Sequence, residues 1–227
     1  MNELLKPLIN LFYPRRAVCM GCGDVFGLDR DDLCEDCRMR LAESWIGPRI
    51  PNRRFQLNGT AYAYNYRGPA GSMARNLKYG SVWILAEEMG ADIARAAEQM
   101  RIADLSFVTA VPMHPQRLRE RGRNHAELLA RSAAARLGAE YTEVLRRTRN
   151  APQQARLSAP ERRENLKDAF AVPPECRELV KGAVILLVDD VCTTGSTAKS
   201  CAEALRRAGA SRVYFAAYAV GGGNRRG

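Results

Sequence analysis

The sequence has no long hydrophobic run, which excludes a function built on a membrane-spanning helix. No apolar stretch reaches the roughly 18 residues that such a helix needs. The apolar segment 1–12 is interrupted by Lys6 and Pro7, and no small-residue cleavage pattern follows it, so it does not resemble a signal peptide. We therefore expect a cytoplasmic protein that does not insert into membranes.

Histidine is scarce, and a common nucleotide-binding motif is absent. His114 and His125 are the only histidines, and neither has a second histidine at metal-ligand spacing, so we expect both to act through hydrogen bonds. The motif G-x-x-x-x-G-K-[ST] occurs nowhere in the chain, which argues against a P-loop nucleoside triphosphatase.

Positive charge is in excess, and most of it lies in two segments. The 227 residues carry a formal net charge of +10, with 46% hydrophobic and 26% charged residues, as in an ordinary globular protein. Residues 112–125 hold four arginines against Glu120, and residues 145–167 hold seven basic residues against Glu161 and Glu164. Concentrated arginine favours a pyrophosphate or a nucleic-acid backbone as partner. The alternative is a solvated face that keeps the protein soluble.

The segment from Val184 to Thr197 is V-I-L-L-V-D-D-V-C-T-T-G-S-T. Five apolar residues without a polar face predict a buried central strand of a parallel sheet that helices cover on both sides. Asp189 and Asp190 fall at its carboxyl end, where open α/β sheets bind ligands. The small residues that follow, with Gly195 among them, predict a loop that opens a helix, and its N–H groups favour a phosphate.

The two acids are expected to accept hydrogen bonds from sugar hydroxyls or to help hold a divalent cation. Two alternatives also place acids after an apolar strand. A receiver domain does so early in its chain, whereas here only one further helix and strand follow. A plain surface turn would explain Asp190 as a capping acid, but not the hydroxyl and glycine pattern after it.

Four of the seven cysteines have paired spacing, Cys19-x-x-Cys22 and Cys34-x-x-Cys37. Four thiolates at this spacing suit a tetrahedral structural zinc, which keeps no open position for catalysis. Such a site contributes roughly 10 to 16 kcal/mol of apparent binding energy, enough to fold a module too small to have a core. Two disulfides, or four unrelated thiols, are the alternatives. The other three cysteines have no spacing partner and are expected to be free thiols.

The rest of the chain alternates predicted strands and helices, which indicates an α/β fold. Strands are expected at 60–66, 106–111, 169–172 and 211–220, a short one at 143–145, and helices at 73–93 with a break at Tyr79-Gly80, at 126–137 and at 198–208. Segment 47–51 predicts a linker, 112–125 an arginine-rich turn, and 175–181 a connector. Lys78 either faces the active site or lies along its helix with the charge in water.

The stretch V-D-D-V-C-T-T-G-S-T resembles the phosphoribosyl pyrophosphate (PRPP) loop of type I phosphoribosyltransferases. In that family the two acids bind the ribose 2- and 3-hydroxyls, and the loop grips the 5-phosphate. The resemblance assigns the hydroxyls to Asp189 and Asp190. It assigns the phosphate to the loop residues Thr193, Thr194, Gly195, Ser196 and Thr197.

Nearly the whole chain is similar to the ComF family, which includes the ComFC competence proteins and the GntX-like proteins. The similarity rests on the paired cysteines, on H-P-Q-R-L-R-E-R-G-R-N-H-A-E-L-L-A, on P-Q-Q-A-R-L-S-A-P-E-R-R-E-N and on the PRPP loop. It implies a zinc-binding module on a type I phosphoribosyltransferase fold and, for some members, a role in DNA uptake during natural transformation. The loop with Arg117 and Arg121 would face pyrophosphate, and a mobile catalytic loop would include Gln153, Arg156, Arg162, Arg163 and Asn165.

Two further predictions concern organisation and function. With the boundary at the linker, residues 1–50 are a zinc-binding module with a leading helix, and residues 51–227 are a phosphoribosyltransferase-like domain. The first functional hypothesis is an enzyme that displaces pyrophosphate from magnesium-bound PRPP, with Arg117 and Arg121 offsetting the charge of the leaving group. The second is a non-catalytic protein that handles single-stranded DNA with the competence and DNA-uptake machinery, with the PRPP site as a sensor or relic.

Overall fold

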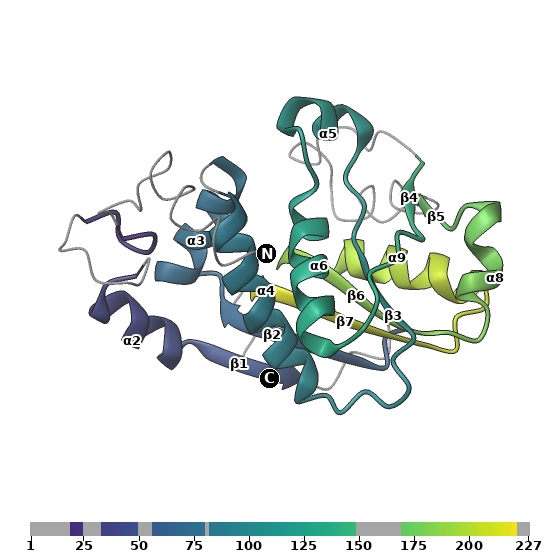
Figure 1. Cartoon of the computed structure of the whole chain (residues 1–227), viewed down its shortest axis with the longest axis horizontal. Helices are drawn as coiled ribbons and strands as arrows, with labels where there is room; N and C mark the ends of the chain where they lie inside the picture. Colours follow the sequence, from purple (N-terminus) through teal and green to yellow (C-terminus); the bar gives the residue numbers. More distant parts are fainter. Residues whose placement is uncertain (1–18, 25–32, 50–55, 80–81, 149–168, 222–227) are drawn as a thin grey trace, which may run out of the picture.

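A five-stranded sheet forms the centre of the protein (Figure 1). It is seen in a computed structural model of the chain, which describes residues 19–24, 33–49, 56–79, 82–148 and 169–221. The strand order is β1-β2-β7-β6-β3, and every neighbouring pair is parallel except β1 and β2. The strands are β1 (Trp45–Arg49), β2 (Gly59–Asn65), β3 (Phe107–Ala110), β6 (Val184–Cys192) and β7 (Arg212–Val220).

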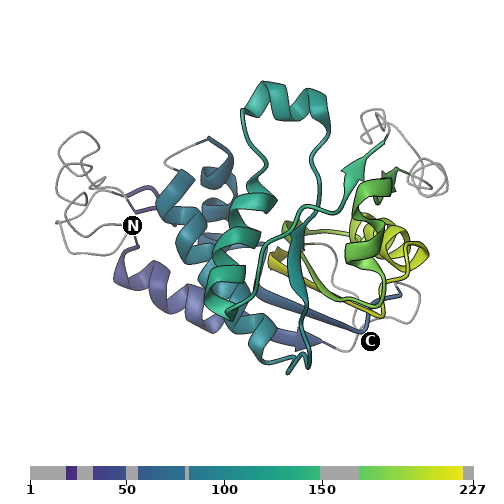
Figure 2. The same cartoon turned by 45° about the vertical axis from the view of Figure 1, so that its right-hand side comes forward.

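Helices cover both faces of this sheet (Figure 2). One face packs against α3 (Gly68–Tyr79), α4 (Val82–Glu98) and α6 (His125–Leu137), and the other against α9 (Ser196–Arg207). The remaining elements are α2 (Glu35–Glu43), α5 (Pro115–Arg121), the 3-10 turn η4 (Pro174–Cys176), α8 (Arg177–Val180) and a small antiparallel sheet of β4 (Arg146–Arg147) and β5 (Phe170–Ala171). The predicted α/β fold is confirmed.

None of the described helices is both long and apolar enough to cross a bilayer.

The apolar run of β6 is buried because both of its faces contact a hydrophobic core. Leu186 and Val188 pack with the α3, α4 and α6 side, whereas Ile185 and Leu187 pack with the α9 side. This two-sided burial explains why the run has no polar face. It also confirms the prediction of a central parallel strand, since β6 lies between β7 and β3.

Segment 47–51 was predicted as a linker, and over its described part this is wrong. Residues Trp45–Arg49 form strand β1, which pairs with β2. Pro48 is tolerated because β1 is an edge strand with a neighbour on one side only, so its missing N–H costs little. The division of the chain into two units after residue 50 stays a prediction. Strand β1 lies before residue 50 but belongs to the main sheet.

Three other expectations need correction. The predicted arginine-rich turn contains helix α5, which projects from the body of the molecule in Figure 1. It forms because His114 caps it, its Nδ1 accepting the Gln116 N–H at 3.1 Å, and because Pro115 suits a first helical turn. The predicted connector contains η4 and α8. The short strand expected at 143–145 lies instead at Arg146–Arg147.

Candidate functional site

Asp189 and Asp190 lie in the C-terminal part of β6, at the edge of the sheet where β3 also ends. Ala110, the last residue of β3, is level with Val188, and the Val111 N–H donates to the Val188 carbonyl oxygen at 2.9 Å. Each carboxylate accepts the next backbone N–H: Asp190 N–H to Asp189 Oδ1 at 2.8 Å, and Val191 N–H to Asp190 Oδ1 at 2.7 Å. These bonds fix both side chains and leave the Oδ2 atoms for other partners.

Burial and charge strongly affect the protonation of Asp189. Burial and the adjacent Asp190 raise the pKa of Asp189 well above its usual range, while the Asp190 N–H and Lys78 act in the opposite direction. Lys78 reaches over from α3, and its Nζ lies 3.0 Å from Asp190 Oδ2. Of the two sequence-based interpretations of Lys78, the structure therefore supports the one that faces the site.

The loop after β6 forms a small hollow at the start of α9. Gly195 is the N-cap of α9 with φ +74°, a left-handed conformation that favours glycine. The hydroxyls of Thr194 and Ser196 are hydrogen-bonded to each other at 2.8 Å. The cavity there measures about 30 Å³, room for about two water molecules. Its lining includes Asp189 and all five predicted phosphate-binding residues, Thr193, Thr194, Gly195, Ser196 and Thr197.

Backbone N–H groups at the start of α9 point into this region, because the first turn of a helix leaves them without intrahelical partners. Together with the helix dipole they favour an anion. The structure thus brings Asp189 and the predicted phosphate loop into one cavity, whereas the Asp190 carboxylate meets Lys78 on α3.

His125 adds a buried imidazole beside the acids. It is 3% exposed, and its Nδ1 has no hydrogen-bond partner among the described residues. Burial lowers its pKa, Asp190 opposes this, and Arg121, Lys78 and Arg123 lower it further, so the neutral form is favoured. The charges of Asp190, Lys78, Arg121 and Arg123 therefore all act on this imidazole.

The charge of Arg117 acts on Arg147, a residue that the sequence did not single out. Burial lowers the pKa of Arg147, and the charge of Arg117 adds to this effect. The Arg147 guanidinium lies over the Phe170 ring, 5.5 Å from its centroid, and its buried Nε has no partner within the described residues. In the sequence, Arg147 is one of seven basic residues between positions 145 and 167, and nothing in the sequence distinguishes it from the other six. Since the charges of Arg117 and Arg147 repel each other, a bound anion would stabilise both.

The four paired cysteines meet at one point. Their Sγ atoms all lie within 4.8 Å of one another, and those of Cys22 and Cys34 are 4.0 Å apart. Zinc–sulfur bonds of about 2.3 Å place sulfurs about 3.8 Å apart on a tetrahedron, so the set fits that ion. Burial would raise the pKa of Cys19, but backbone N–H groups of Cys34, Cys22 and Gly21 outweigh it and lower the pKa to about 6. Only the Cys19 thiolate is stabilised in this way, since the pKa of Cys22 is raised to about 11, and burial and the neighbouring cysteine side chains raise the pKa of Cys37.

Comparisons with known proteins agree with this geometry. The family described as phosphoribosyl transferase domain matches residues 123–226, which include the end of β6, the loop and α9. DNA utilization protein YhgH of Escherichia coli (strain K12) is 39% identical over 206 residues, 87% of each chain. The chain belongs to the ComF family.

Other relatives in and around the ComF family align over shorter stretches. Competence protein F of Haemophilus influenzae is 32% identical over 121 residues, 53% of this chain and 52% of that protein. YhgH of Salmonella typhimurium is 37% identical over 123 residues, 53% and 51% of the two chains. The chain thus spans about half the length of these two relatives. Among solved structures, a glutamine PRPP amidotransferase from B. subtilis complexed with ADP and GMP is 20% identical, with a TM-score of 0.39 over 58% of this chain and 25% of that one.

The strand order and the family match together make this a phosphoribosyltransferase-type fold with an N-terminal four-cysteine cluster. The ligand roles of the individual residues stay predictions. Those of Gln153, Arg156, Arg162, Arg163 and Asn165 concern positions outside the described residues.

Proposed function

We propose that the protein binds magnesium-bound PRPP at the end of β6 and displaces pyrophosphate from it. The observation that carries the proposal is the shared cavity of Asp189 and the loop Thr193–Thr197 at the start of α9. The loop N–H groups and hydroxyls would hold the 5-phosphate, and the carboxylates of Asp189 and Asp190 would hold the ribose hydroxyls, with Asp190 Oδ2 shared with Lys78. Magnesium, when bound, would offset the negative charge of the pyrophosphate next to the ribose hydroxyls.

In the proposed reaction, the bond between ribose C1 and the pyrophosphate oxygen breaks, while an acceptor nucleophile bonds to C1 and gives up a proton. The departing pyrophosphate carries the electron pair of the broken bond. Lys78, which is paired with Asp190, and Arg121, whose charge acts on His125, would offset this charge, and Arg117 with Arg147 offers a second pair of cations. The nearby imidazole of His125 is favoured in its neutral form, so it adds no further positive charge there.

We propose further that the four-cysteine cluster holds a structural zinc. With four sulfur ligands the metal would have no open position, so its contribution would be to the fold of the N-terminal segment. The cytoplasmic location expected from the sequence stays a prediction.

Calorimetric titration with PRPP, with and without magnesium, tests the donor site, and ribose 5-phosphate serves as the comparison. We expect PRPP with magnesium to bind more tightly than ribose 5-phosphate. The double substitution Asp189→Asn and Asp190→Asn should remove this advantage while the cysteine cluster keeps its metal. Equal PRPP affinity in that double variant would refute the assignment of the two acids.

A second function, the handling of single-stranded DNA, is supported by the names of the relatives and by the net charge. The relatives are called DNA utilization protein and Competence protein F, and this chain carries a formal charge of +10. We therefore propose a role with the DNA-uptake machinery, in which bound DNA releases counterions. Binding of a single-stranded oligonucleotide should weaken steeply as salt rises, and a flat salt dependence would speak against the role.

A further inference from the structure

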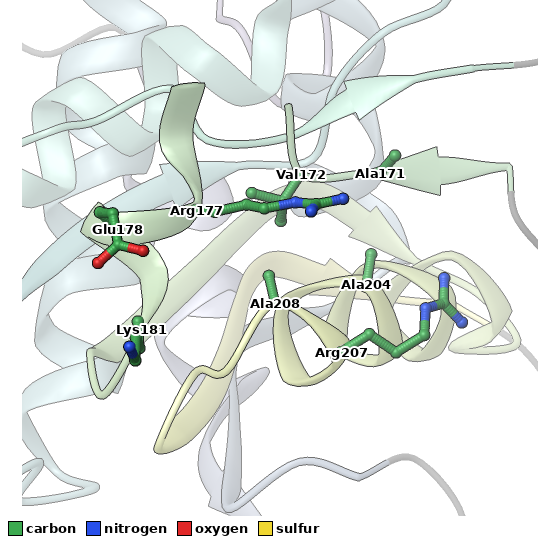
Figure 3. A pocket seen from close by; sticks show the side chains of 8 residues that line it. All are labelled: Ala171, Val172, Arg177, Glu178, Lys181, Ala204, Arg207 and Ala208. Carbon is green, nitrogen blue, oxygen red and sulfur yellow. The ribbon is translucent and has the colours of Figure 1, made fainter. Parts of the chain in front are cut away.

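A groove between α8 and α9 lies on a different part of the molecule from the PRPP loop. It encloses about 390 Å³ and is lined by residues of β5, α8 and α9 (Figure 3). Its α9 residues, Ala204, Arg207 and Ala208, are 8 to 12 positions beyond Ser196, the first residue of the helix. At 1.5 Å of rise per residue they lie about 12 to 18 Å along the axis from the phosphate loop. The groove is therefore separate from the proposed donor site.

Three cations and one acid line the groove. The cations are Arg177, Lys181 and Arg207, and the acid is Glu178. In Figure 3 the guanidinium groups of Arg177 and Arg207 extend toward the same end, whereas the Glu178 carboxylate points the other way. The floor consists of small apolar side chains, Ala171, Val172, Ala204 and Ala208, which offer no hydrogen-bonding groups. The groove thus presents positive charge around an apolar base.

Two of these cations, Arg177 and Lys181, are not neutralised by an acid among the described residues. Within the described residues, the side chains of Arg177 and Lys181 have no hydrogen-bond or ion-pair partner. The closest acid on the preceding turn, Glu175, is instead paired with Arg146 at 3.0 Å. This differs from other surface cations such as Lys199, which is paired with Glu203 at 3.5 Å.

A neighbouring arginine, Arg206, has a structural role at the end of α9. Arg206, next to Arg207 in the last turn of α9, already supports the following segment by donating to the carbonyl oxygens of Ala210 and Ser211 and to Asn58 Oδ1. Arg177 is the first residue of α8 and Lys181 is its C-cap residue, and the only buried residue of α8 is Val180. Two unpaired cations on an exposed helix face cost little stability and gain most from an external anion.

We infer that this groove binds the sugar-phosphate backbone of single-stranded nucleic acid. The cations are spread along the groove, with Lys181 at one end and the two guanidinium groups toward the other, and do not converge on one point (Figure 3). Such an array fits successive phosphates of a chain better than one phosphate ion, and the apolar floor fits sugar carbons. The inference rests on the second proposed function and is independent of PRPP binding.

The test is the salt dependence of binding of a fluorescently labelled single-stranded oligothymidine, measured by anisotropy on the full chain. The double variant Arg177→Gln and Lys181→Gln should bind more weakly than the unmodified protein. The slope of log affinity against log salt should fall by about 1.4, since each lost phosphate contact on a single strand removes about 0.7.

The matched control is Arg101→Gln with Arg136→Gln, two exposed arginines that follow or end the helices α4 and α6 on the opposite face of the sheet. It removes the same net charge and should leave the slope unchanged. Magnesium-dependent PRPP binding should be equal in all three proteins, which also shows that both variants are folded.

Three outcomes would overturn the inference. If the unmodified protein does not bind the oligonucleotide, both the groove assignment and the DNA-handling function are wrong. If it binds, but the two double variants lose affinity equally, the protein binds DNA elsewhere or by diffuse charge. If labelled polyglutamate shows the groove-dependent binding and the oligonucleotide does not, the groove is a site for an acidic polypeptide.

Discussion

The ammonium nitrogen of Lys78 on α3 lies 3.0 Å from Oδ2 of Asp190 at the end of β6. The two side chains are 25% and 18% exposed, so the pair is largely shielded from water. An ion pair in such a place is stronger than one on an open surface, and removal of one partner leaves a poorly solvated charge. A ribose hydroxyl or a cation that binds Asp190 has to share it with this ammonium group.

The substitution Lys78→Met should therefore lower the free energy of unfolding by about 1 to 3 kcal/mol, the range for a charged hydrogen bond that loses one partner. Urea unfolding of the ligand-free protein measures this. Asp190→Asn combined with Lys78→Met should recover part of the loss, because the unpaired carboxylate is then gone. A double-mutant cycle with no coupling energy would contradict the importance of the pair.

Lys199→Met is the control for that experiment. Lys199 is paired with Glu203 four residues along α9, and its side chain is 41% exposed. Exposed pairs of this spacing contribute about 0.3 to 0.5 kcal/mol, so this change should be far milder. Equal losses for both lysines would mean that the shielding of Lys78 has no energetic effect.

Gly195→Ala should weaken phosphate binding as well as stability. With φ +74° the position is left-handed, and alanine there costs about 1 to 2 kcal/mol. Gly138→Ala is a control for the backbone penalty alone, because Gly138 has φ +63° at the end of α6 and open space around it. Both variants should unfold more easily, but calorimetry with ribose 5-phosphate should show a loss only for Gly195→Ala. The same affinity in both would place the phosphate elsewhere.

Asp92 on α4 should make stability depend on pH. Burial raises its pKa to about 6, and Tyr64 and Arg95 offset only part of this effect. The folded protein holds this proton more tightly than the unfolded chain. The free energy of unfolding should therefore decrease as the pH rises from about 4 to about 6, by at most about 3 kcal/mol. Asp92→Asn should remove the contribution of Asp92 to that fall, while Asp189, whose pKa is also raised, continues to contribute.

Urea unfolding over a pH series compares this variant with the unmodified protein. The asparagine variant should be the more stable of the two at pH 8 and similar to it at pH 4. The same exchange at Asp104, whose side chain is 86% exposed, is the control and should not reproduce the gain at pH 8. A parallel pH profile for Asp92→Asn and the unmodified protein would contradict the prediction.

Gly21→Ala should disrupt the cysteine cluster. A Cβ at this position would lie 2.7 Å from Cys37 Sγ and 2.9 Å from Cys37 Cβ, so one of the metal-facing sulfurs would have to move. Gly23→Ala is the control, because Gly23 also lies in the first pair and has open space around it, although its φ of +88° adds a backbone penalty that Gly21→Ala does not have. Metal analysis should give about one zinc per chain for the unmodified protein and for Gly23→Ala, and clearly less for Gly21→Ala. Full zinc content in Gly21→Ala would refute the fit.

Local sequence patterns predicted the part of the fold that depends on neighbours along the chain. The run Val184–Val188 predicted a buried strand because burial on two faces leaves no polar position. The hydroxyl-rich loop with Gly195 predicted the start of a helix, and paired cysteines predicted a cluster. In each case, the information lies within a few residues.

Other features depend on contacts between distant segments, and local patterns did not determine them. Pro48 suggests a linker, because the sequence does not show that its strand lies at the edge of the sheet, where a proline is tolerated. Lys78 has the same pattern as a surface lysine on an amphipathic helix, and its partner is more than a hundred residues away. Arg147 is distinguished from its basic neighbours only by Phe170, which belongs to the opposite strand.

Helix α3 has attachments at two places only two residues apart. The Asn76 side-chain amide donates to the Met20 carbonyl oxygen at 3.0 Å, inside the first cysteine pair, and Lys78 holds Asp190. The cysteine cluster and the acids therefore both contact the same turn of helix α3. If PRPP affinity is measured on protein from which the metal has been removed, it will depend on the position of α3 as well as on the residues that bind the sugar.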